Sequence, residues 1–131
     1  MKKINRQPGF TLVEILVVVC ILAILASLIV PNIVRARVDA NDATAQATLK
    51  TIANALENYA SANTQYPATT TAMIGPTPPY LSTDYFSGGY NGFTYTATLS
   101  SYTYSVLATP LGSTYGSASF TISTGGVLVR N

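Results

Sequence analysis

One carboxylate stands out among the residues of this chain that could do chemistry. Glu14 lies near the start of an apolar segment that continues to Val30, and Ser27 is the one polar interruption after it. A segment of this length can cross a bilayer, which takes roughly 20 residues. An acid in such a segment normally has a partner and a function. The apolar residues that follow offer nothing to neutralise it, so we expect the partner to come from another chain.

The sequence lacks the usual parts of an enzyme. It has no histidine, the most common general base and metal ligand. Its single cysteine, Cys20, lies in the apolar segment and fits a small buried hydrophobic residue. The C-terminal part has neither a carboxylate pair nor a reactive thiol. We therefore expect no catalytic residues, no metal site, no cofactor and no enzymatic activity.

Charged residues are scarce, at 9% of the chain, and they are unevenly distributed. Lys2, Lys3 and Arg6 lie in the leader, and no charged residue occurs from 85 to 129. No basic patch of the kind that binds nucleic acid remains, so we predict no direct nucleic-acid partner. The hydroxyl-rich C-terminal part fits either an exported surface or a surface that packs against copies of the same chain.

Residues 1–9 form a short basic leader that ends in Pro8-Gly9. A secretory signal peptide would close its apolar region with a small-residue cleavage site, and no such site follows here. We therefore expect cleavage at Gly9 and retention of the apolar segment in the mature protein. The leader should stay in the cytoplasm by the positive-inside rule, with the C-terminus outside. Arg35 and Arg37, beyond the segment, weaken that count.

One long helix is predicted from Phe10 to about Ala62, because glycine is absent and alanine is abundant in its second half. Pro31 is expected to interrupt it. Residues 10–35 form its hydrophobic part, which belongs in a membrane or in the core of a filament. Residues 36–62 form an amphipathic part, whose apolar stripe should pack on the C-terminal domain. The stripe consists of Leu49, Ile52, Ala53, Leu56, Tyr59 and Ala60.

The rest of the chain predicts an antiparallel sheet, which makes the fold class α+β. Residues 63–92 are rich in proline and are predicted to form a connecting loop, with short turns or a 3₁₀ piece near Tyr80–Asp84. Within 93–131, apolar residues that alternate with Thr and Ser predict three or four strands. A two-residue turn is expected at Ser100-Ser101. The predicted strands are 93–99, 102–108, 118–122 and 127–130.

The segment Gly9-Phe10-Thr11-Leu12-Val13-Glu14, behind a basic leader and ahead of an apolar helix, resembles the start of a type IV prepilin. Pro31 matches a position where these proteins often carry proline. A long helix followed by an antiparallel sheet is similar to the fold of the whole family. The resemblance is specific over residues 1–35 and architectural beyond about residue 62.

The resemblance implies a role for each residue of the motif. Gly9 would be the residue after which a prepilin peptidase of the membrane cuts, and Phe10 would become the N-methylated N-terminus. Glu14 would attract the amino terminus of a neighbouring copy during assembly. Pro31 would mark where the helix loosens as the subunit leaves the bilayer. The chain would wait in the inner membrane as a single-pass protein and join a helical homo-oligomer, an extracellular filament, through the pilus assembly machinery.

Two features separate this chain from many members of that family. No disulfide can close its C-terminal loop because Cys20 has no partner, so strand pairing alone should hold that end. Type II secretion pseudopilins often bind calcium there, but residues 85–131 contain no Asp or Glu. We favour the major pilin of a type IV pilus-like filament, with a type II secretion pseudopilin as the alternative. A monomeric membrane-anchored surface domain, which would need no cleavage at Gly9, is a third possibility.

Overall fold

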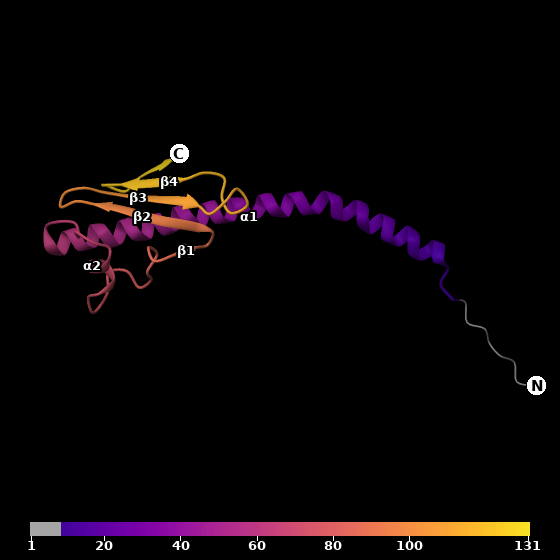
Figure 1. Ribbon diagram of the computed structural model, residues 1–131, viewed down its shortest axis with the longest axis horizontal. Helices are drawn as coiled ribbons and strands as arrows, with labels where there is room; N and C mark the ends of the chain where they lie inside the picture. The colour runs from indigo at the N-terminus through magenta and orange to yellow at the C-terminus, as the bar shows by residue number, and fades with distance from the viewer. Residues whose placement is uncertain (1–8) are drawn as a thin grey trace, which may run out of the picture. The chain divides into compact units, whose positions relative to one another are not determined.

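The computed structural model describes residues 9–131 and has an α+β fold. Helix α1 (Leu12–Asn63) and the short helix α2 (Thr71–Ile74) precede the strands, and the second half of α1 runs alongside the sheet (Figure 1). Two compact units divide between Arg35 and Ala36. The predicted fold class, a long helix whose second half packs on an antiparallel sheet, is confirmed. The strands are β1 (Gly89–Tyr90), β2 (Phe93–Leu99), β3 (Tyr104–Pro110), β4 (Phe120–Ser123) and β5 (Val127–Arg130).

The first half of α1 is an apolar helix with an uncovered surface. From Leu12 to Val34 its large hydrophobic side chains are between 46% and 81% exposed. An 18-residue window of α1 has a mean hydropathy of 3.1, and none of that window is buried. By length and composition alone, α1 is the one helix within residues 9–131 that could cross a membrane. Lipid or other protein must cover such a surface, because water does not favour contiguous apolar patches.

Helix α1 continues through Pro31, so the predicted interruption does not occur in the described helix. Proline lacks the backbone donor that would bond the carbonyl of Ser27. Polar side chains on either side donate to carbonyls of the same turns. Ser27 Oγ donates to the carbonyl of Ile24 (2.7 Å), and Asn32 Nδ2 donates to that of Leu28 (3.0 Å). Such local bonds help a helix to tolerate proline in apolar surroundings.

The second half of α1 buries most of the predicted apolar stripe. The buried members are Leu49, Ile52, Ala53 and Leu56. Tyr59 and Ala60, at the end of the stripe, are half-buried. The helix ends at Asn63, close to the predicted end near Ala62, because Thr64 takes a left-handed backbone conformation (φ 62°) that cannot continue it.

The five strands form one antiparallel sheet in the order β1-β2-β3-β4-β5. Strands β2 and β5 have the predicted bounds, and the other two predicted strands are present, as β3 and β4, with shifted ends. The predicted turn at Ser100-Ser101 is too short, because Leu99 pairs with Tyr104 and leaves a four-residue loop between the strands. Tyr102 therefore lies outside β3 and is 75% exposed. Strand β1 is an addition to the prediction and lies in the segment predicted as a connecting loop.

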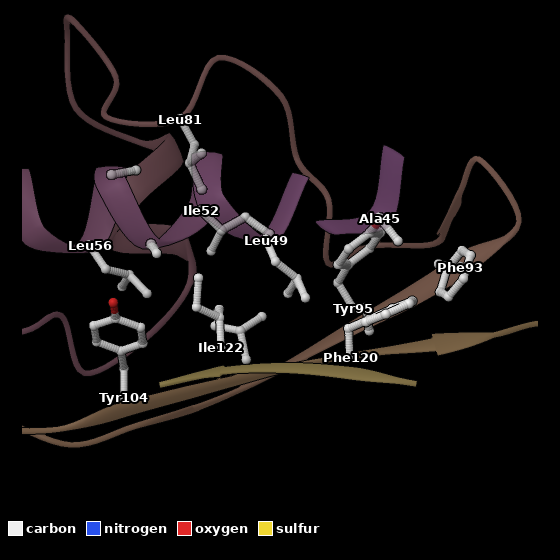
Figure 2. Close-up of a cluster of buried hydrophobic side chains, with 14 of the residues drawn as sticks. Ala45, Leu49, Ile52, Leu56, Leu81, Phe93, Tyr95, Tyr104, Phe120 and Ile122 are labelled. Atoms are coloured by element: carbon white, nitrogen blue, oxygen red, sulfur yellow. The ribbon is translucent and has the colours of Figure 1, made fainter. Parts of the chain in front are cut away.

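The hydrophobic core of the second unit lies between α1 and the sheet. Figure 2 shows Leu49 and Leu56 on the helix facing Ile122 and Tyr104 on the strands. Inward positions alternate along β2, β3 and β4, as the buried, half-buried, buried pattern at the start of β3 shows. Because period-two alternation places every second side chain on one face, this pattern was readable from the sequence.

The segment between α1 and the sheet folds back over the core. Helix α2 lies in this segment, whereas residues Tyr80–Asp84, predicted to form short turns or a 3₁₀ piece, contain bends and no 3₁₀ helix. The carbonyl of Met73 accepts the backbone N–H groups of Tyr80 (2.9 Å) and Leu81 (3.0 Å). Met73 and Leu81 are buried as a result, so the connecting segment contributes to the core.

Candidate subunit assembly site

Glu14 is held by the start of its own helix. The backbone N–H of Thr11 donates to Glu14 Oε2 (2.8 Å), and Thr11 Oγ1 donates to the same oxygen (2.7 Å). In return, the backbone N–H of Glu14 donates to Thr11 Oγ1 (3.2 Å). Thr11 directly precedes the first turn of α1, and Glu14 lies in that turn. The two residues therefore form a reciprocal capping box.

The capping box changes what Glu14 needs from another chain. It gives one carboxylate oxygen two hydrogen bonds, and the positive end of the helix dipole favours the negative charge. The hydrogen-bond partner of Glu14 thus lies in the same chain, whereas a charge partner from another chain stays a prediction. The charge itself is not neutralised along the helix, since no basic residue occurs between Glu14 and Arg35. Thr11 was missed as a site residue, although the spacing T-x-x-E is a known capping signal.

Gly9 and Phe10 lie before the helix, next to the capping box. Neither is helical, and Phe10 is 86% exposed. A side-chain carbon at Gly9 would meet nothing within 4 Å among the described residues. An open apolar groove of about 620 Å³ follows this stretch, lined from Phe10 to Cys20. Of the predicted site residues, Gly9, Phe10 and Glu14 thus lie together, whereas Pro31 lies near the end of the apolar half of α1. Residues 1–8 of the predicted leader lie outside the described part of the chain.

The C-terminal loop, residues 111–119, is fastened to α1 in the second unit. Asp42 accepts the backbone N–H of Ser117 at Oδ1 (3.1 Å) and Oδ2 (3.3 Å), and it accepts the hydroxyl of Ser117 as well. Asn41 Nδ2 donates to the carbonyl of Tyr115 (2.9 Å). The prediction that strand pairing alone holds this end is therefore wrong: two consecutive helix residues also hold it.

A second polar cluster fastens the far end of the same helix. Glu57 accepts the hydroxyl of Tyr66 (3.0 Å) and the backbone N–H of Gly125 (3.3 Å) in the turn between β4 and β5. The rings of Tyr66 and Tyr104 meet edge to face, with centroids 5.1 Å apart. Burial, and then the nearby carboxylate of Glu57, raise the pKa of Tyr66, and the same causes raise the pKa of Tyr104 to about 12. The cluster therefore holds the start of the connecting segment and the turn between β4 and β5 to α1.

Known proteins are similar to this chain in its N-terminal segment and over most of its length. Residues 4–30 match the prokaryotic N-terminal methylation motif. The chain is 34% identical over 110 residues to the type IV wide pilus major component PilA4 of Thermus thermophilus, and the match covers 81% of this chain and 84% of that protein.

The chain is also similar to type II secretion system core protein G from two bacteria. It is 37% identical to the Escherichia coli protein and 40% identical to the Vibrio cholerae protein, each over 94 residues and 69% of this chain. The matches span 65% and 64% of those relatives, just under two thirds of their length.

Proposed function

Because this chain belongs to the type IV pilin family, we propose that it is the major structural subunit of a type IV pilus-like filament. The observation that carries the proposal is the start of α1. There, an acid held in a capping box begins an apolar helix whose surface is uncovered. In a monomeric anchor Glu14 would serve only as a helix cap, and its charge would have no partner. A polymer needs both, because every copy must cover the helix of its neighbours.

Processing would prepare the helix start for assembly. A prepilin peptidase in the membrane would cut after Gly9, on the cytoplasmic side, and Phe10 would become the N-methylated first residue. The match of residues 4–30 to a methylation motif supports this step. The exposed, non-helical stretch at Gly9 and Phe10 supports it too, because a protease needs an extended backbone. The chain would cross the inner membrane with its N-terminus in the cytoplasm and its C-terminus outside.

Assembly would then pair Glu14 with the new amino group of Phe10 in a neighbouring copy. An unpaired charge is unfavourable in apolar surroundings, whereas two opposite charges that meet there offset each other. Moving α1 from lipid to a bundle of helices changes apolar contacts little, so the polar pair would set the axial register. Pro31 would allow α1 to loosen as the subunit leaves the bilayer, because one backbone hydrogen bond is already missing there. The pilus assembly machinery of the inner membrane would drive the transfer.

A pseudopilin of a type II secretion system is the second candidate function. The similarity to core protein G of two bacteria favours it. Both candidates share the fold, the processing and the polymer, and they differ in what the polymer does. A long surface filament indicates a pilus, whereas a short filament that is needed for export of folded proteins indicates a pseudopilus.

Filaments sheared from cells that make the chain test the proposal. We expect the electron microscope to show fibres made of this chain in the wild type and in the control variant Gly88→Val, whose glycine faces open space. Gly9→Val should keep the leader and produce no fibres. Wild-type cells that hold the chain only as an unprocessed membrane protein would contradict the proposal. Deletion of the chain that stops protein export, with no fibres at the surface, would favour the pseudopilin.

A further inference from the structure

The C-terminal loop is the place where resemblance to type II secretion pseudopilins implies a bound calcium ion. Calcium takes six to eight oxygen ligands at about 2.3–2.6 Å, usually with several carboxylates among them. The loop and its neighbouring strands supply none, because residues 85–129 contain no charged side chain. Within residues 9–131 no group of three or more His, Cys, Asp or Glu could hold a metal. The donor set of this loop therefore does not fit calcium.

One carboxylate does reach the loop, and protein donors already use both of its oxygens. Asp42 is 8% exposed, and each of its oxygens faces the backbone N–H of Ser117. The hydroxyl of Ser117 donates to Oδ2 as well. These N–H and O–H groups present their positive ends to both carboxylate oxygens. A cation could bind Asp42 only by breaking the contacts that place the loop.

A positively charged side chain near the C-terminus completes this network. Arg130 Nη2 donates to Ser117 Oγ (2.9 Å), and the same hydroxyl donates a hydrogen bond to Asp42. A guanidinium keeps its charge at every pH at which proteins fold. Backbone pairing of Arg130 with Phe120 fixes its position in β5, and Asn131 donates to the carbonyl of Ser119 (2.9 Å). Hydrogen bonds that are charge-assisted in this way are stronger than neutral ones.

We propose that Arg130, Ser117 and Asp42 form an internal closure of the C-terminal loop, in which a guanidinium takes the place of a divalent cation. The closure joins the helix, the loop and the last strand of the second unit at one serine hydroxyl. Asn41 adds a second attachment at Tyr115. The head of this subunit is therefore complete without calcium. This inference concerns how the head folds, and it holds whether the filament is a pilus or a pseudopilus.

Thermal unfolding of the full-length chain in detergent tests the closure. All nine tyrosines lie in the second unit, so the near-ultraviolet circular dichroism of tyrosine reports on that unit alone. The Tm of the wild type should be the same in EDTA and in calcium chloride. Asp42→Asn and Arg130→Gln should each lower the Tm by about 4–8 °C in a unit of this size. The double variant should lose less than the sum of the two, because both act through one network.

Two exposed residues near the start of the same unit provide matched controls. Asp39→Asn and Arg37→Gln carry the same chemical changes outside the closure and should leave the Tm unchanged. A wild-type Tm that falls in EDTA and recovers with calcium would overturn the inference. The inference would also be overturned if the Tm losses of Asp42→Asn and Arg130→Gln added up in the double variant, or if neither variant lowered the Tm. If Asp42→Asn does not fold, Ser117→Ala serves in its place, and protease cleavage within the loop should become faster in that variant.

Discussion

Gly116 in the C-terminal loop is predicted to accept no side chain. It is buried, and a Cβ built there would lie 2.9 Å from Phe93 Cε2 and from Pro110 Cβ, and closer still to Phe93 Cζ. Real Cβ atoms essentially never approach other atoms within 3.0 Å. Phe93 cannot turn away, because its side chain is fully buried in the core. Gly116→Ala must therefore displace either the ring or the loop.

The size of the effect follows from this crowding. An extra methyl group in a well-packed core destabilises by about 1–3 kcal/mol. Replacing glycine by alanine also stiffens the unfolded chain, which returns about 0.4–1 kcal/mol. From the middle of the two ranges the net loss is about 1.3 kcal/mol, which in a unit of this size corresponds to a fall in Tm of about 5–10 °C.

Two other glycines separate crowding from backbone strain. Gly88→Ala adds a methyl group in open space and should leave the Tm unchanged or slightly higher. Gly125→Ala also meets open space, but its φ of +81° is strained for alanine, so we expect a loss of about 1–2 kcal/mol without crowding.

The near-ultraviolet dichroism of the tyrosines, followed during heating of the full chain in detergent, measures all three variants. A Tm for Gly116→Ala equal to that of Gly88→Ala would refute the close packing of the loop on Phe93. That result would also weaken the case for a closed loop.

Three further predictions concern the helix start, the core and the response to high pH. Glu14→Gln can still complete the capping box but cannot attract an amino group, so membrane levels should hold while filament yield falls at least about tenfold; normal yield would rule out the charge pairing. Leu49→Ala leaves a cavity in the core and should lower the unfolding free energy by about 2–5 kcal/mol in denaturant titrations. A much smaller loss would contradict the full burial of Leu49 between α1 and the sheet. Since the folded pKa of Tyr104 is about 12 and its ordinary value is 10.0, stability should fall as pH rises from 10 to 12. Tyr104→Phe should flatten that fall in pH-dependent melts, and an unchanged slope would assign the effect to other groups.

The regular elements were predictable because their periodicity is local. The apolar run and the absence of glycine fixed the existence of α1, and period-two alternation fixed β2 at its true bounds. Strand β1 was missed because two residues carry no alternation. Its signal was the turn Asn91-Gly92, whose φ angles of 49° and 82° are those of a tight hairpin. Helix α2, at four residues, is too short to show a period at all.

The residues of the candidate site were likewise predictable only where their sequence signal is local. Gly9, Phe10 and Glu14 form a contiguous motif, so a reading of the sequence locates them. Thr11 carries a local signal that went unused. The contact between Asp42 and Ser117 joins positions 75 residues apart in the chain, and no sequence pattern around either residue predicts it. Contacts of that kind depend on how the loop folds over the helix, which only the three-dimensional structure provides.

The mass of the subunit in purified filaments is the most direct test of the proposed processing and assembly. A polymer built on Glu14 and a freed amino terminus predicts a subunit that begins at Phe10 and is one methyl group heavier than the unmodified chain. Fragmentation should place that methyl group on the first nitrogen. A subunit that still begins at Met1, or a processed chain that never polymerises, would contradict the account.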